Sequence, residues 1–188
     1  LMILGADIST SCTGFCIVND EGAPVHFSYV ELSKEKNFFE KAKKVKLHIL
    51  DLMIKYPIDD IAVEDYLTSF AKGRSSAKTL FKLAKFNGII QWICYSDLGM
   101  EATPINVNDA RKTSSITVLS KKKTIETTKE QVLRQVKDQI GDLFCFPTKI
   151  LKSGPRKGLE VTDKVSYDMA DAYVIAKANW LEKREKAL

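Results

Sequence analysis

The order of apolar runs along the chain limits its fold more than any other sequence feature. Three short apolar runs fill the first third, and the turn Asn-Asp-Glu-Gly at residues 19–22 separates the last two, as in a β-hairpin. Two more short runs alternate with longer stretches of helical spacing. The five predicted strands cover residues 3–8, 14–18, 23–32, 61–64 and 104–107. This order predicts an α/β fold: a mixed five-stranded sheet, its first three strands an antiparallel meander, flanked by helices.

Four stretches have apolar residues at the spacing of amphipathic helices. Pro57 ends the first, because proline cannot continue a helix. Thr128 followed by Gln131 predicts a capping box at the start of the third. The four predicted helices cover residues 38–56, 80–94, 128–140 and 166–181. Two segments lack any periodicity: residues 113–127 predict a loop, and residues 147–164, with glycines, a proline and several charges, predict a mobile insertion.

Composition excludes several classes of protein. The chain has 188 residues, 45% hydrophobic and 28% charged, which is ordinary for one globular domain over residues 1–188. It has no uncharged apolar run of about 18 residues, so we expect no membrane contact. Its first residues do not resemble a signal peptide. The 4 cysteines lack the paired spacing of a zinc site, which predicts reduced thiols and a cytoplasmic location.

Basic residues are in mild excess, 29 against 24 acidic residues, for a net charge of +5. Their clustering is more informative than their number. Most lysine runs are simply solvated helix faces, but repeated clusters in loops and helix starts favour a polyanionic partner. The clusters lie within residues 34–46, 72–85, 111–123 and 149–157.

Four acidic residues occupy unusually apolar surroundings. Asp7 ends the first predicted strand and Glu64 ends the fourth, and α/β sheets place ligands at such strand ends. Asp168 and Asp171 share one face of the last predicted helix, among apolar residues. Each acid alone has an ordinary explanation as a capped turn, a salt bridge or a helix N-terminal charge.

Four converging carboxylates without His or Cys partners favour hard divalent cations. Two such ions can support hydrolysis of a phosphodiester, and surrounding lysines would hold a phosphate backbone. The four acids must then meet in one pocket. An arginine filling the gap between them would argue against this interpretation.

The segments ILGADISTSCTGFCIV, IAVEDYL, LAKFNGIIQWI and YDMADAYVIA, in this order, resemble the RuvC-type Holliday junction resolvases of the RNase H-like superfamily, especially their phage and viral branch. The resemblance implies a crossover junction endodeoxyribonuclease that acts as a homodimer and resolves four-way DNA junctions by paired nicks. It implies that Asp7, Glu64, Asp168 and Asp171 bind two Mg²⁺ ions, for which Mn²⁺ can substitute. Lys129 matches a family lysine near the scissile phosphate, and Lys112 matches another basic position.

The resemblance also bears on how DNA would be held. Leu67 stands where relatives often carry an aromatic wedge, and an apolar side chain can still unstack bases. The hydroxyls of Ser9 and Thr10, beside Asp7, either contact a DNA phosphate or only shape the turn. Two roles, core packing and a dimer surface, are open for five residues of the predicted helix 80–94: Phe81, Leu83, Phe86, Ile90 and Trp92. The remaining candidate DNA contacts are Lys72, Arg74, Lys121, Lys122 and Lys123.

Three alternative functions stay open at this stage. One is another RNase H-like nuclease, acting on flaps, other branched DNA or RNA–DNA hybrids. A second is an ATP-binding domain of the actin and sugar-kinase type, because ADISTSCTG alone fits both families. A third is an inert junction-binding module that has kept the fold.

Overall fold

The computed structural model describes residues 1–65 and 77–187. Its main sheet has five strands in the order β3-β2-β1-β4-β5. The first three strands pair antiparallel, whereas β4 runs parallel to β1 and β5 parallel to β4. This is the mixed sheet with an antiparallel meander that the sequence predicts. The strands are β1 (Ile3–Asp7), β2 (Cys12–Val18), β3 (Pro24–Glu31), β4 (Asp60–Glu64) and β5 (Thr103–Ile105).

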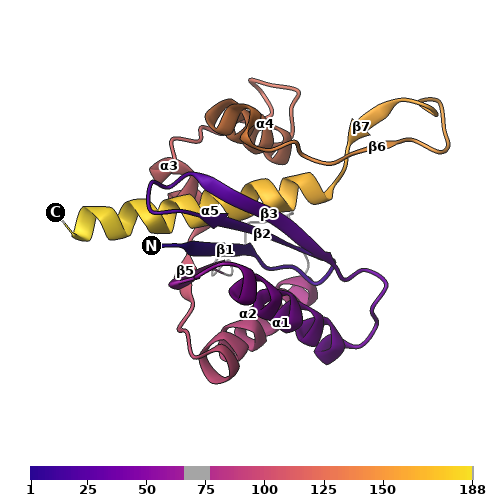
Figure 1. Cartoon of the computed structure of the whole chain (residues 1–188). Helices are drawn as coiled ribbons and strands as arrows, with labels where there is room; N and C mark the ends of the chain where they lie inside the picture. Colours follow the sequence, from indigo (N-terminus) through magenta and orange to yellow (C-terminus); the bar gives the residue numbers. More distant parts are fainter. Residues whose placement is uncertain (66–76, 188) are drawn as a thin grey trace.

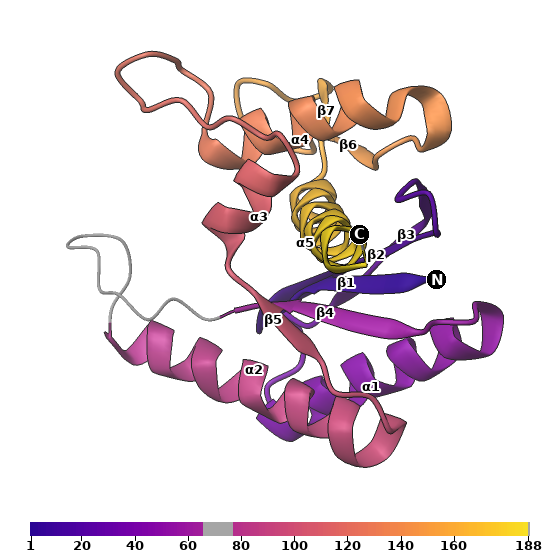
Figure 2. The ribbon, with the colours of Figure 1, turned by 90° about the vertical axis from the view of Figure 1, so that its left-hand side faces the viewer.

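Helices cover both faces of the sheet (Figures 1 and 2). On one face lie α1 (Phe38–Lys55) and α2 (Ala77–Leu98). On the other face α5 (Val165–Lys186) lies directly on β1 and β2. The short α3 (Val107–Thr113) and α4 (Thr128–Ile140) pack against α5 on its outer side, and a 3-10 helix, Gly141–Leu143, follows α4.

The hydrophobic core is divided by the sheet into two parts, as β1 illustrates. Ile3 faces the cluster formed with α3, α4 and α5, while Leu4 and Ala6 face the cluster formed with α1 and α2. Because both faces of β1 are buried, its sequence is a continuous apolar run rather than an alternating one. The same logic applies to α5, which lies between the sheet and α4 and is therefore apolar on several sides.

The structure contains two elements that the sequence did not predict and shifts a third feature, the cap of α4, by one residue. The segment predicted as a mobile insertion contains an antiparallel hairpin of β6 (Thr148–Ile150) and β7 (Glu160–Thr162). These strands are only three residues long and largely exposed, so they lack a hydrophobic pattern. The capping box of α4 uses Thr127 and Glu130, one residue before the predicted pair. Helix α3 was not predicted because seven residues are too few to show a helical period.

The described helices also bear on membrane association. Across residues 1–65 and 77–187, none is long and apolar enough to span a bilayer.

Candidate functional site

Two of the four acids meet at the ends of neighbouring parallel strands. Asp7 is the last residue of β1 and Glu64 the last of β4, and the preceding residues, Ala6 and Val63, are paired across the two strands. The Asp7 side chain is buried. Burial raises the pKa of Asp7 well above its usual value, and the neighbouring carboxylates of Glu64 and Asp171, with a hydrogen bond to Glu64, raise it further.

Helix α5 brings the other two acids to the same place. Asp171 lies in its second turn with its side chain only 8% exposed, and Asp168 lies one turn earlier. Burial raises the pKa of Asp171, and the positive charges of Arg111 and Lys129 partly offset this effect. The charge of Asp171 raises the pKa of Asp7, and the charge of Glu64 raises the pKa of Asp171. Acids from three separate elements, β1, β4 and α5, therefore form one electrostatic cluster.

A glycine makes this convergence sterically possible. Gly14 on β2 is the antiparallel partner of Asp7. A Cβ atom at Gly14 would lie 2.2 Å from the backbone oxygen of Asp168. Gly5 on β1 has the same role one turn further along α5, where a Cβ would lie 2.3 Å from the backbone oxygen of Ala172. The two glycines therefore let the acidic end of α5 rest directly on β1 and β2.

Lys129, in the first turn of α4, reaches into the acidic cluster. Its Nζ atom lies 2.6 Å from Oδ1 of Asp168 and 4.0 Å from Oδ2 of Asp171. Burial lowers the pKa of Lys129, but the carboxylates of Asp7, Asp168 and Asp171 outweigh burial and hold that pKa above its ordinary value. The side chain remains 51% exposed, so this ammonium group is both part of the cluster and open to solvent.

A second cation in the cluster, Arg111 of α3, was missed by the sequence reasoning. Its Nη2 atom lies 3.4 Å from Oδ1 of Asp171, and its side chain is 16% exposed. Its buried Nε atom has no hydrogen-bond partner among the described residues. The sequence reasoning instead selected the adjacent Lys112, which points away, is 80% exposed and pairs with Asp109 at 3.6 Å. Only the packing of α3 against α5 decides which of the two basic residues meets the acids.

The carboxylate oxygens of the cluster are the ligands that a hard divalent cation prefers, but they do not lie in the positions of a formed metal site. Among the residues that the structure describes, its four carboxylates face two cationic side chains, so that with all the acids ionised these six groups carry a net charge of two negative charges. Within the described ranges, however, no three His, Cys, Asp or Glu side chains are gathered closely enough to hold a metal ion. Arg111 and Lys129 contact Asp171, and Lys129 also holds Asp168. The arginine that would count against a metal site is thus present at Asp171, although Asp7 and Glu64 have no ion pair with it.

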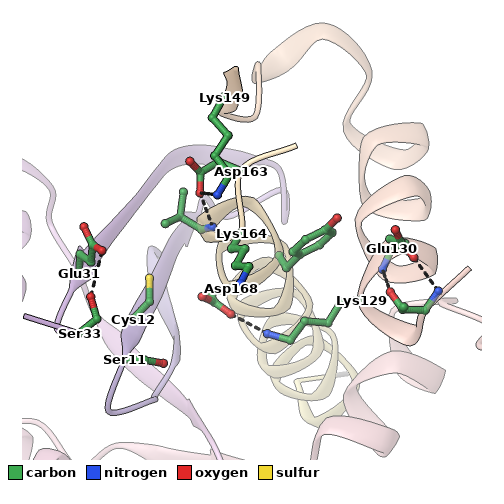
Figure 3. Close-up of a pocket in the computed structure, with 13 residues that line it drawn as sticks. Ser11, Cys12, Glu31, Ser33, Lys129, Glu130, Lys149, Asp163, Lys164 and Asp168 are labelled. Carbon is green, nitrogen blue, oxygen red and sulfur yellow. Dashed lines mark hydrogen bonds and ion pairs between the residues drawn. The ribbon is translucent and has the colours of Figure 1, made fainter. Parts of the chain in front are cut away.

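An open groove of about 850 Å³ lies beside this cluster, of which Asp168 and Lys129 line it (Figure 3). Asp168 and Lys129 form one side, and Cys12 lies opposite them on β2. Burial and the adjacent Asp168, which also hydrogen-bonds the thiol, raise the pKa of Cys12 to about 12, so this cysteine stays a neutral thiol. Lys149 and Lys164, from the β6–β7 region, line the outer part of the groove.

Other residues fix the backbone around the cluster. The buried Asn87 of α2 donates a hydrogen bond to the backbone oxygen of Glu64 at 2.6 Å. Lys41 of α1, also buried, donates to the backbone oxygen of Thr10 at 2.5 Å. The hydroxyl of Ser9 hydrogen-bonds within its own turn, to Ser11. The structure thus supports a turn-forming role for the Ser9 hydroxyl, and a DNA contact by Ser9 or Thr10 stays a prediction.

The remaining candidate DNA contacts lie away from the acids or outside the described residues. Lys121, Lys122 and Lys123 are exposed in the loop between α3 and α4. Leu67, Lys72 and Arg74 fall in residues 66–76, which are outside the described part of the chain.

Comparisons with known proteins identify the fold but assign no family. No protein-family model matches the chain, and no curated protein matches it. Among solved structures, T. thermophilus RuvC in complex with a Holliday junction substrate is 16% identical, with a TM-score of 0.65 over 98% of this chain and 96% of that chain. Another Thermus thermophilus RuvC structure is 18% identical, with a TM-score of 0.62 over 99% and 97%. The yeast mitochondrial Holliday junction resolvase Ydc2 is 15% identical, with a TM-score of 0.55 over 98% and 80%. The chain therefore has the RuvC and RNase H-like fold that the sequence predicts.

Proposed function

We propose that this chain is a Mg²⁺-dependent endonuclease that resolves four-way DNA junctions by paired nicks. One observation carries the proposal: on a fold shared with RuvC, the four acids selected from the sequence lie in one cluster with Lys129, and two members of that cluster, Asp168 and Lys129, line an open groove. The solved structures of similar fold include a resolvase bound to a Holliday junction. Membership of the phage and viral branch stays a prediction, as does a cytoplasmic location.

In this proposal Asp7, Glu64, Asp168 and Asp171 hold two Mg²⁺ ions, or Mn²⁺ in their place. When bound, these ions supply an activated water and stabilise the leaving oxygen of the phosphodiester. The protein's part is to keep four carboxylates close together in spite of their mutual repulsion, which favours binding of a cation.

Lys129 and Arg111 would have different roles once the acids bind metal ions. Lys129, half exposed at the groove, can turn from Asp168 toward a phosphate oxygen of the DNA. Arg111 is more buried, so it stays near Asp171 and offsets part of the negative charge of the cluster. We therefore assign Lys129 to the substrate and Arg111 to the positioning of Asp171.

The outer face of α2 supports the homodimer that paired nicks require. Phe86 and Ile90, which the sequence left open between the core and a dimer surface, are fully buried in the core. Phe81, Trp92 and Tyr95 are instead 68%, 64% and 63% exposed. With Gly88, at which a Cβ would meet no atom within 4 Å, these residues follow one helical face. We propose that a second copy of this chain covers this face by the same face of its own α2.

Replacing Trp92 with Glu is expected to convert the dimer to monomer. The substitution would bury a charge at the centre of the interface in place of an aromatic side chain. The dissociation constant of the dimer should rise at least about 30-fold, which is typical of losing a residue that dominates an interface. Light scattering after size exclusion measures the change. Ile54→Glu on α1, where the side chain is 84% exposed, is the matched control and should not alter the mass. A Trp92→Glu variant with the mass of the unmodified protein would exclude this interface.

The cleavage assay tests the function itself. The purified protein is incubated with a labelled four-way junction, a Y-shaped duplex and a linear duplex, with Mg²⁺ and then with EDTA. We expect paired nicks in the junction only, and no product with EDTA, because the acids alone cannot activate water. Equal cutting of all three substrates would replace the resolvase proposal by a general nuclease. Cutting in EDTA would remove the metal from the mechanism.

A further inference from the structure

The β6–β7 hairpin carries positive charge that nothing in the described structure neutralises. It extends beyond α4, at the end of the molecule where α5 begins (Figure 1). Of its two acids, Asp163 pairs with Lys149 at 3.7 Å, whereas Glu160 accepts a hydrogen bond from the hydroxyl of Thr148 and forms no ion pair with a described cation. The tip adds three exposed cationic side chains for which no ion pair is seen among the described residues: Lys152, Arg156 and Lys157.

Backbone hydrogen bonds give this tip a defined shape. The amide of Gly158 donates to the backbone oxygen of Leu151 at 2.9 Å, and the amide of Leu151 donates to that of Leu159 at 3.0 Å. The amide of Lys157 donates to the backbone oxygen of Gly154 at 3.0 Å, which closes a turn that contains Arg156 and Lys157. A preformed turn loses less conformational entropy on binding than a flexible loop would.

The hairpin is continuous with the groove of the candidate site. Lys149 and Lys164, at its base, line the same groove as Lys129 and Asp168 (Figure 3). A DNA strand that occupied the groove would therefore pass the base of the hairpin that carries the three cations of the tip. A two-stranded ribbon also has the dimensions that the DNA major groove admits.

A protein partner fits this surface less well than DNA does. The cores of protein interfaces are depleted in lysine, whereas phosphate backbones attract it. Ile150 and Leu159 are 65% and 54% exposed on the same ribbon, where they can contact sugars or base edges. We propose that the β6–β7 hairpin is an arm-binding ribbon: it contacts one duplex arm of the junction at the point where that arm leaves the groove. This proposal rests on the proposed function, which it extends from the cleaved phosphate to the arm beside it.

The test removes the three cations at the tip, in the triple variant Lys152→Gln, Arg156→Gln and Lys157→Gln. Their side chains are exposed, so the fold should be unaffected, which thermal unfolding checks. We expect junction binding in EDTA to weaken about 10-fold or more at physiological salt. The slope of log K against log salt should fall by about 2 to 3, one contact for each lost cation.

Binding to junctions with arms of different length distinguishes the loss of a contact with the arm from a general effect of the lost positive charge. On a junction with arms of about two helical turns, roughly 20 base pairs, the variant should bind less tightly than the unmodified protein. On arms of about half a turn, roughly 5 base pairs, the two proteins should bind alike. The control variant Lys183→Gln, Arg184→Gln and Lys186→Gln removes the same charge at the far end of α5 and should keep the full dependence on arm length (Figure 1).

The outcomes distinguish this proposal from the function on which it rests. Equal affinity and salt slope for the hairpin variant and the unmodified protein would overturn the arm-binding ribbon, while junction cleavage remained intact. A weakening that is the same for short and long arms would overturn it as well. An unmodified protein that neither binds nor cuts the junction would instead overturn the proposed function, and the ribbon with it.

Discussion

Replacing Asp7 with Asn is expected to abolish cleavage while making the metal-free protein more stable. Loss of one charged ligand should slow junction cleavage by about 1,000-fold, a size typical of removing one charge-stabilising group from an active site. Binding of the junction should persist, because the basic side chains that would bind the DNA phosphates are unchanged in this variant. Single-turnover cleavage and a binding titration measure the two effects separately.

The gain in stability follows from the pKa of Asp7, which burial and the nearby acids raise well above its usual value. Below about pH 3 the carboxyl is protonated in both the folded and the unfolded chain, so Asn and Asp should be nearly equivalent. As the pH rises toward the raised pKa, the folded state holds a proton that the unfolded state has lost, and the unmodified protein loses stability. At neutral pH Asp7→Asn should therefore be more stable by about 1–2 kcal/mol, or about 3–6 °C in Tm.

Thermal unfolding in EDTA across this pH range checks the sign, and Mg²⁺ provides the second comparison. Added Mg²⁺ should raise the Tm of the unmodified protein and leave Asp7→Asn nearly unchanged. Asp138→Asn is the matched control, because Asp138 is 70% exposed and lies on the outer side of α4. A Tm of Asp7→Asn below that of the unmodified protein at neutral pH would contradict the crowding of acids. Undiminished cleavage would contradict the assignment of Asp7 itself.

Replacing Gly14 with Ala is expected to destabilise the fold and to remove activity at the same time. The added Cβ would lie 2.2 Å from the backbone oxygen of Asp168 and 2.7 Å from the backbone nitrogen of Met169. Backbone atoms of a buried helix cannot turn aside as a side chain can, so α5 must shift away from β2. We expect a loss of about 3 kcal/mol, at the upper end of the usual cost of overpacking. The shift would also move Asp168 and Asp171 away from Asp7 and Glu64.

Denaturant unfolding and the cleavage assay measure both effects of Gly14→Ala. Gly88→Ala is the control, since its Cβ meets no atom within 4 Å and α2 should gain up to about 1 kcal/mol from the better helix former. Unfolding is followed at several protein concentrations, because Gly88 lies on the proposed dimer face. A Gly14→Ala variant with unchanged stability would show that α5 does not approach β2 this closely.

The acids could be selected from the sequence because each depends on local pattern. Asp7 and Glu64 end short apolar runs, and strand ends can be read from such runs without knowing the sheet order. Asp168 and Asp171 share a helix face because their spacing is three residues. The parallel pairing of β1 with β4 then brings two of these local features together.

The basic partner Arg111 could not be selected in the same way. Arg111 and Lys112 are adjacent in the sequence and equally charged, yet Arg111 contacts Asp171 and Lys112 pairs with Asp109 on the outside. Likewise Phe86 and Trp92 of α2 are both aromatic, but one is in the core and the other is exposed. These differences depend on which face of each helix packs against its neighbour. The sequence does not reveal the packed face of α3, because seven residues are too few to show a helical period.

The sequence by itself determined the class of fold and the four acids, because hydrophobic periodicity and strand ends are local properties of the chain. Only the tertiary structure decided how close those acids come, that Arg111 rather than Lys112 meets Asp171, and that residues 148–162 form a basic hairpin beside the groove. The physical reason is that electrostatic contacts and steric limits such as the one at Gly14 act through space, between residues as far apart as β2 and α5.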